Sequence, residues 1–556
     1  MEVFMGKFFM NNFSSPSPIF LRTRNKAFLV ALAIVIIFVA ALFVNMLAIP
    51  NMLSHDQLHN ETILMKADHS ELFLRDGLFH DESWRMHYTP FLAVLRFSNH
   101  YTGGSESSYR LFVPVTFFVF TFGMFLLLYL QDISFIVSIS VAFVSSVFIR
   151  VLIDNWGVPG PSEMIARFLT LPFYPYIFLL FYRFAERQWF PVVFFVVGLL
   201  ANVHQVSALN VALILTIAFF IRFGISRGTI LRGLLFTPFF ILGALPFLME
   251  QVFSLRATPL LSLPDIPYIQ ALYLTHPHLT PEGMMAVYKG YFITHWYLFW
   301  PLAAVFGVSM FFQRRGGGIP RISSARASLA LAVSIITVTL GTTVINQVLL
   351  LVLHWKIHLV HEPRAFQFIY IPFYLSLGYL LQKIWSERRR WFWQWKTLAI
   401  MCIIGIVAGA GLVGIHAVST ISRLLLNKKE FSTGDTCRLP IYGWIEKNTK
   451  QNDLFLIDPN MYPPFRICAK RSIVYTYRDT ASALRTNYLV EWARRKEIVE
   501  RAYAEGSSKL LETAREFGAD YIVSQRCVAV PGIRKIYQDS VYQEDCIYKV
   551  PAIAGK

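Results

Sequence analysis

Charged residues are scarce in this chain. Of its 556 residues, 15% are Asp, Glu, Lys or Arg and 55% are hydrophobic, with fifty Phe among them. Soluble globular proteins carry about 25% charged residues. The deficit excludes a single soluble core of this length and predicts a polytopic membrane protein.

Negative charge is also in short supply, because 51 Lys and Arg outnumber 34 Asp and Glu and leave a formal net charge of +17. A nucleic-acid partner would need a basic patch on a soluble face. The Lys and Arg residues instead lie mostly in short connections between apolar runs, where membrane topology explains them. We therefore expect the lipid bilayer, and no nucleic acid, as a partner.

Several motifs are missing as well. There is no Gly-rich phosphate loop in the C-terminal region, which argues against a nucleotide site there. Neither Cys-x-x-Cys nor His-Glu-x-x-His is present, so intramembrane proteolysis has no motif to support it. A zinc or copper site between loops stays open as an alternative, because His354, His358 and His361 have i, i+4, i+7 spacing.

Long apolar runs are abundant. A bilayer core about 30 Å thick needs roughly 20 apolar residues at about 1.5 Å rise each. About eleven runs meet this requirement, near 27–49, 111–130, 132–152, 164–182, 189–203, 206–221, 233–250, 291–312, 328–353, 365–383 and 397–419. The polar sequence NVHQVS separates the fifth run from the sixth, and it indicates either a tight turn or a break within one bent, partly re-entrant element. The first run is too long for a secretory signal and lacks a small-residue cleavage site, which indicates an uncleaved anchor.

The positive charges predict the orientation of the chain. With the N-terminus inside, every clearly basic short connection lies on the cytoplasmic side. These connections contain Arg22, Arg24, Lys26, Arg183, Arg187, Arg222, Arg227 and Arg232, followed by the segments QRRGGGIPRISSAR and KIWSERRRWFWQWK. We therefore expect a cytoplasmic N-terminus at 1–26, a membrane domain at 27–423 with a long outer loop at 50–110, and an extracytoplasmic domain at 424–556. The segments 251–290 and 354–364 are expected on the outer side too.

From about residue 420 the sequence changes character. Helical patterns such as SKLLETAREFG alternate with short β-branched runs such as ADYIVSQRC, which predicts a small α/β layer domain. Four of the five Cys lie in it, namely Cys437, Cys468, Cys527 and Cys546. They permit two disulfides in three possible pairings, and free buried thiols are a comparable alternative.

The outer loop 50–110 is rich in titratable residues. Asp56 closely follows the first membrane helix, and the flanking His55 and His59 share one face if the segment is helical. A carboxylate at the membrane surface can deprotonate an acceptor hydroxyl or orient a divalent cation at a phosphate leaving group. Asp56 is the main candidate, because a helix end holds a functional group more rigidly than a loop does. The alternative is that this acid, like Asp76 and Asp81 further along, only keeps the loop solvated.

Other segments expected near the outer surface offer polar partners for Asp56. They supply Glu163, His204, His358, His361, Arg364 and Gln367. Polar residues at such depth are costly unless they pair or face a cavity. Arg364 is the main candidate for a phosphate contact, because a guanidinium can hold a phosphate with paired hydrogen bonds. An ion pair with Glu362 or Asp56, or simple interfacial anchoring, stays open for it.

The order of these features resembles the GT-C superfamily of membrane glycosyltransferases. The pieces that carry the resemblance are HSELFLRDGLFHDESWRMHYTPFLAVLRF in the first outer loop and WIEKNTKQNDLFLIDP, RSIVYTYRD and FGADYIV in the C-terminal region. The resemblance covers most of the chain in architecture but only these short pieces in sequence. It implies an α-helical polytopic, GT-C-like fold in the bacterial inner (plasma) membrane, with a periplasmic C-terminal α/β domain.

The resemblance also implies a function, the inverting transfer of a sugar from a polyprenyl-phosphate donor to an envelope acceptor on the outer face. Asp56 matches the first-loop acid that activates the acceptor, with Asp76 or Asp81 as a second acid and Arg364, by analogy of place, as the phosphate contact. The implied cofactor is a divalent cation, Mg or Mn. The chain departs from the family pattern in having no Asp-x-Asp pair and no Trp-Trp-Asp signature, which leaves metal dependence and the acceptor open.

Two other functions stay open at this point. One is a transporter or flippase for a lipid-linked envelope precursor, with Arg364, His204 and Glu163 inside a cavity. The other is a non-catalytic membrane assembly protein whose α/β domain binds a partner.

Overall fold

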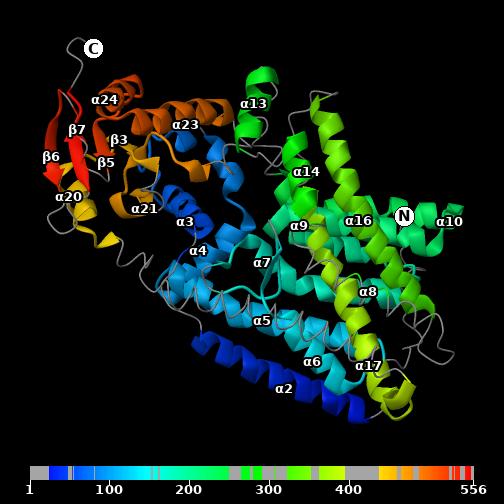
Figure 1. The fold of residues 1–556 in the computed structure, drawn as a ribbon. Helices are drawn as coiled ribbons and strands as arrows, with labels where there is room; N and C mark the ends of the chain where they lie inside the picture. Colours follow the sequence, from blue (N-terminus) through cyan, green and yellow to red (C-terminus); the bar gives the residue numbers. More distant parts are fainter. Residues whose placement is uncertain are drawn as a thin grey trace, which may run out of the picture.

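The structure is a computed structural model, and it describes most of the chain. The described residues are 24–47, 53, 55–80, 82–151, 154–160, 163–249, 265–275, 280–290, 293, 303, 307, 322–351, 362–394, 437–459, 465–479, 488–524, 527, 529–530, 532–538 and 545–551. They form a helical domain and a smaller C-terminal domain built on a sheet (Figure 1).

Four described helices are long and apolar enough to cross a membrane. They are α2 (Arg24–Leu47), α5 (Ser105–Tyr129), α9 (Val192–Phe223) and α16 (Ile322–Leu351). These helices confirm a membrane-integral protein, but they do not confirm the predicted count of about eleven spans. The predicted runs near 291–312 and 397–419 lie largely or wholly outside the described residues.

Shorter elements make up the rest of the described helical domain. They are α3 (His55–Asp68), η1 (Gly77–Phe79), η2 (Glu82–His87), α4 (Pro90–Thr102), α6 (Phe135–Ser145), β1 (Ile149–Val151), β2 (Asp154–Trp156), α7 (Ala166–Thr170), η4 (Leu171–Phe173), α8 (Tyr174–Phe184), α10 (Arg227–Leu234), α11 (Phe236–Gly243), α13 (Asp265–Thr275), α14 (Pro281–Lys289), η8 (Glu362–Ile369) and α17 (Tyr370–Gln394).

The run predicted at 132–152 is not one helix. Its helical part, α6, ends at Ser145, and the chain continues into the antiparallel hairpin β1–β2. Gly157 follows the hairpin with φ +90°, and a Cβ there would overlap the carbonyl oxygen of Val147. Only glycine combines this backbone angle with such a close approach, so the hairpin folds back tightly against the end of α6.

The polar sequence NVHQVS lies inside a single helix, α9, which is kinked rather than divided by a turn. His204 has φ −147° and ψ 93°, values outside the helical region, while the residues on both sides remain helical. Its Nδ1 atom lies 2.8 Å from the Ser207 hydroxyl. A side chain that bonds within the helix in this way replaces backbone bonds that the kink removes. The structure therefore shows a bend within one element and no turn between two separate helices.

Close glycine contacts hold α9 against α11. A Cβ on Gly198 would overlap the carbonyl oxygen of Phe240, and one on Gly243 would overlap that of Phe195. Asn202 adds polar bonds at the same contact, because its amide donates to the Gly243 oxygen at 2.9 Å and its Oδ1 accepts from Phe247 N at 2.9 Å. Small residues and buried amides of this kind pack helices within membranes, where hydrophobic burial gives little net attraction between them.

The C-terminal domain contains a five-stranded sheet in the order β4–β3–β5–β7–β6. Its strands are β3 (Leu454–Ile457), β4 (Ser472–Ile473), β5 (Tyr521–Ser524), β6 (Arg534–Gln538) and β7 (Cys546–Lys549). Strands β4, β3 and β5 are parallel, and β7 and β6 are added antiparallel. The helical elements are α20 (Pro440–Asn448), α21 (Phe465–Ala469), η10 (Tyr477–Asp479), α23 (Tyr488–Glu505) and α24 (Ser507–Glu516).

Both faces of the sheet are buried at β3 and β5. Phe455 and Ile457 belong to one core with residues of α20 and α21, whereas Leu456 and Ile522 belong to the other with residues of α23 and α24. Successive side chains of a strand point to opposite faces, so short, continuously apolar strands feed both cores. The predicted α/β layer domain is confirmed as a sheet between two helical layers.

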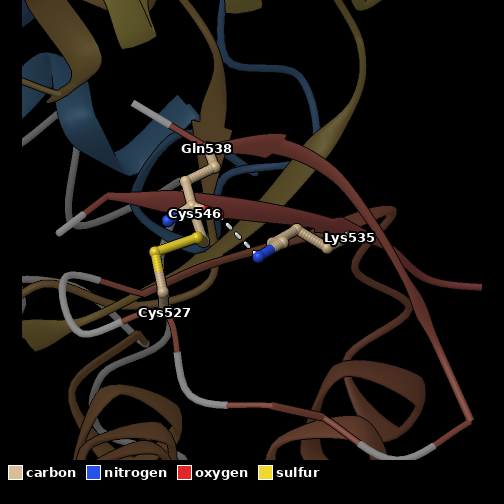
Figure 2. The surroundings of a disulfide bond; sticks show 4 residues. All are labelled: Cys527, Lys535, Gln538 and Cys546. Atoms are coloured by element: carbon tan, nitrogen blue, oxygen red, sulfur yellow. Dashed lines mark hydrogen bonds between the residues drawn. A yellow bond between two sulfur atoms is a disulfide. The ribbon is translucent and has the colours of Figure 1, made fainter. Parts of the chain in front are cut away.

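Two disulfides lie in this domain, Cys437–Cys468 and Cys527–Cys546. Of the three pairings open from the sequence, the structure selects this one. Figure 2 shows the second bond at the start of β7, beside the Lys535–Gln538 hydrogen bond of the neighbouring strand β6. The disulfide therefore links Cys527, which follows β5, to the first residue of the antiparallel strand β7.

Candidate functional site

The candidate site is built around α3, the helix that follows α2. Figure 1 shows α3 beside the C-terminal domain at one end of the helical domain, while α10 lies at the other end. Asp56 is in the first turn of α3 and its side chain is exposed. The exposed backbone N–H groups of a first helical turn favour a carboxylate. Asp56 therefore lies at the start of the helix that follows α2 in the sequence.

Most of α3 is buried or half-buried, and the helix packs against α4 and against α21 and η10 of the C-terminal domain. Gln57 is fully buried, and its amide donates to the carbonyl oxygen of Met164 at 2.8 Å. Leu58 and Leu64 also belong to the buried core. Contacts on several sides therefore hold α3 in one orientation, and Asp56 stays exposed at its first turn.

Glu61 is a half-buried acid, with its Oε1 atom buried, that our sequence reasoning did not identify. Burial raises the pKa of this carboxyl from 4.5 to about 7, the nearby charge of Asp68 adds to the effect, and a hydrogen bond with the Ser105 side chain opposes it. The fully buried Tyr109 of α5 also lies within electrostatic range of Glu61 and Asp56. The i, i+4 spacing of Gln57 and Glu61 was the available signal, because it places both on the buried face of α3.

Of the two histidines predicted beside Asp56, the structure describes the side chain of His59 but not that of His55. His59 is half-buried, and its ring lies edge-on to that of His87, with 6.5 Å between the ring centroids. His55 is the first residue of α3, but the placement of its side chain lies outside the described part of the structure. Asp81 also lies outside the described residues. His59 therefore faces the outer loop, where η2 packs next to α3.

Asp76 lies where the outer loop contacts the C-terminal domain. It is 0% exposed, and Arg466 of α21 donates to both of its oxygens, at 2.8 and 2.9 Å. Backbone N–H groups of Leu78 and Ile473 donate to the same carboxylate. A carboxylate with both oxygens bonded in this way has no access to a substrate hydroxyl, so this placement argues against the predicted role of Asp76 as a second catalytic acid.

The remaining described candidates lie on neighbouring elements. Glu163 is half-buried just before α7, His204 is half-buried at the kink of α9, and Gln367 is buried in η8. Both α7 and η8 pack against α9, and the Gln57–Met164 bond joins α3 to the start of α7. The structure thus brings the elements that carry these residues together.

Arg364, the predicted phosphate contact, is half-buried in the first turn of η8. His358 and His361, predicted just before it, lie outside the described residues. Among the residues that the structure describes, no three His, Cys, Asp or Glu side chains gather where they could hold a metal ion. The divalent cation therefore stays a prediction.

The fold formed by these elements is similar to that of a solved arabinofuranosyltransferase. The chain is similar to the cryo-EM structure of arabinofuranosyltransferase AftD from mycobacteria, with a TM-score of 0.52 and 13% identity over 94% of this chain. A mutant of AftD gives a TM-score of 0.52 with 15% identity over 93% of this chain. This chain spans only 40% of AftD in the first comparison and 41% in the second.

Comparisons of sequence add one short match. Residues 438–499 match a family described as "Domain of unknown function (DUF6798)". This match covers α20 to the first part of α23 in the C-terminal domain. No curated protein matches the chain.

Proposed function

We propose that this chain is a membrane glycosyltransferase of the GT-C type, which moves a sugar from a polyprenyl-phosphate donor to an envelope acceptor on the outer face. The observation that carries the proposal is the likeness of fold to AftD over 94% of the chain. The position of Asp56, exposed in the first turn of the helix that follows α2, supports it.

In this proposal Asp56 is the general base. It removes the proton from an acceptor hydroxyl as that oxygen attacks the anomeric carbon of the donor sugar. The bond between that carbon and the phosphate oxygen breaks, and polyprenyl phosphate leaves with the bonding electrons. A single displacement of this kind inverts the anomeric centre.

Arg364 is the proposed contact for the departing phosphate. A guanidinium offers paired donors that match phosphate oxygens, and η8 packs against α9 and α16 within the membrane domain. A divalent cation, if one binds, would neutralise charge at the same phosphate.

The C-terminal domain is proposed to lie outside the cytoplasm. Its two disulfides support this location, because such bonds persist in oxidising compartments. The basic residues at the far end of the membrane helices support the same orientation through the positive-inside rule. For example, Arg222 at the end of α9 donates to the Phe181 oxygen and pairs with Glu186 at 3.2 Å.

The test compares Asp56→Asn with Asp68→Asn in membranes supplied with labelled polyprenyl-phosphate sugars. Arabinofuranose is the first sugar to try, because AftD is named as an arabinofuranosyltransferase. Loss of a general base lowers the rate by about 100-fold or more, so we expect transfer to fall by that factor in Asp56→Asn. Asp68 is the matched control, because it lies on the same helix and pairs with Arg96 at the surface.

Unchanged transfer in Asp56→Asn would remove Asp56 as the base. If the wild-type chain in liposomes moves a lipid-linked donor across the bilayer without forming a product, the transporter alternative replaces the glycosyltransferase.

A further inference from the structure

Residues 75–79 of the outer loop form a turn that docks into the C-terminal domain, and we call them the docking turn. Asp76 is the buried centre of this contact. Its Oδ2 accepts from Arg466 Nε at 2.9 Å and from Ile473 N at 3.1 Å, while its Oδ1 accepts from Arg466 Nη2 at 2.8 Å. The contact therefore joins positions 390 residues apart in the sequence.

A second acid completes the pairing of Arg466. Asp479, also 0% exposed, accepts from Nη1 at 2.6 Å and from Nη2 at 2.7 Å. Burial opposes the charge on Arg466, but the two carboxylates outweigh it and hold its pKa above the ordinary value. Phe79 of the docking turn covers the guanidinium, whose carbon lies 5.6 Å from the ring centroid. The turn thus closes over an ion cluster shielded from water.

Further bonds hold the edge of the docking turn. The Arg75 side chain pairs with Asp520 at 2.5 Å and donates to the Gly518 oxygen. Its backbone N–H donates to the Ser472 hydroxyl at 3.3 Å. The turn therefore contacts the C-terminal domain in α21, in β4 and just before β5.

Gly77 allows the closest approach between the two domains. A Cβ on this residue would overlap the ring of Tyr488, the first residue of α23. Gly77 has an ordinary backbone conformation, since it is not among the residues with positive φ. A glycine is therefore required here by space, not by backbone geometry.

The segment that leads into the docking turn is bonded both to the turn and to α3. On the side of the turn, the Asp76 N–H donates to the Phe73 carbonyl oxygen at 3.2 Å. Lys66, in the last turn of α3, donates to the carbonyl oxygens of Ser70 and Leu72, each at 2.6 Å. Lysine near a helix end satisfies carbonyls in this way and is favoured by the helix dipole. A continuous set of bonds therefore runs from the sheet of the C-terminal domain through the docking turn to the helix that carries Asp56.

We propose that the C-terminal domain positions α3, and with it Asp56, through the docking turn. The C-terminal domain then acts by holding the base in place, and the docking turn contains positioning residues. This role rests on the proposed function. It predicts that loosening the contact lowers the turnover number while the affinity for the donor stays the same, because Asp56 moves relative to the substrate.

The test uses the full-length chain in membranes and compares Gly77→Ala with Gly443→Ala. Gly443 is the matched control, because it lies in α20 with open space around its Cα. We expect kcat to fall at least tenfold in Gly77→Ala with KM for the donor within twofold, and trypsin to cleave residues 70–90 faster. Adding Tyr488→Ala makes room for the new methyl group, so the double variant should recover most of the lost kcat.

Arg75→Ala provides a second variant in case Gly77→Ala does not fold. Its ion pair with Asp520 is partly exposed, with side chains 41% and 38% accessible, so its loss leaves the buried cluster in place. We expect a two- to fivefold fall in kcat.

If the Gly77→Ala chain folds and trypsin cleaves it faster but kcat stays normal, the positioning role is overturned. The proposed function is not affected by that result. A rise in KM at unchanged kcat would overturn it as well, because the turn would then serve substrate binding. If Gly77→Ala does not fold, normal kcat in Arg75→Ala overturns the role. An inactive wild-type chain would remove the proposed function, and this role with it.

Discussion

Glu61 makes a quantitative test of the packing of α3 possible. Its carboxyl is buried between α3 and α5, with Ser105 and Tyr109 nearby, and the pKa is raised from 4.5 to about 7. The folded chain therefore holds a proton more tightly than the unfolded chain does. The contribution of the protonated Glu61 carboxyl to stability is complete below pH 4.5 and is lost as the pH rises through about 7.

The expected size of the effect follows from this difference. At about 1.4 kcal/mol per pH unit, ionisation of Glu61 costs the folded state about 3 kcal/mol at pH 8. Glu61→Gln removes the charge but keeps a polar group of similar size. We therefore expect the variant to be more stable than the wild type by about 2–3 kcal/mol at pH 8 and by less than about 1 kcal/mol at pH 5.

Thermal unfolding of the purified full-length chain in detergent measures this difference at the two pH values. Glu71→Gln is the control, because Glu71 is an exposed acid just after α3 whose side chain is 57% accessible. It pairs with the similarly exposed His69, and such a pair contributes little to stability, so the control should shift the melting temperature by much less than Glu61→Gln at pH 8. Equal stabilisation of Glu61→Gln at pH 5 and pH 8 would refute the reasoning, because the gain would then not come from the charge.

Two further variants test the C-terminal domain. Arg466→Met leaves Asp76 and Asp479 buried without their cation, so we expect a loss of about 3–5 kcal/mol in unfolding free energy. Chemical denaturation measures it, and a loss under about 1 kcal/mol would mean that water enters the cluster. Cys437→Ser with Cys468→Ser opens a disulfide across 31 residues, which should cost about 3–4 kcal/mol through the entropy of the unfolded chain. Thiol labelling of the unfolded wild type should find only Cys402 reactive before reduction, and labelling of all five Cys would contradict the pairing.

Local patterns in the sequence predict the elements and the class of fold. Apolar runs such as 111–130 predict α5, and alternating helical and β-branched segments predict the α/β domain. The position of Asp56 is equally local, because it depends on where α2 ends and α3 begins. Each of these features is set by residues within a few helical turns of one another, so the sequence carries them directly.

The count of spans and the kink of α9 were harder to predict. Hydropathy detects apolar composition, but it does not distinguish a spanning helix from α6 followed by a hairpin, or from α7, η4 and α8 in succession. Whether NVHQVS makes a turn or a kink depends on the bond between His204 and Ser207 and on the packing of α11 against α9.

The chemical environment of each acid was decided by tertiary structure alone. Asp56, Glu61 and Asp76 are similar carboxyls within one short segment, yet one is exposed, one is buried against α5 and one is paired with Arg466. The pairing of the four cysteines was decided in the same way. The physical reason is that burial and pairing set the charge and access of a side chain. They depend on residues between 19 and 390 positions away that only folding brings into contact.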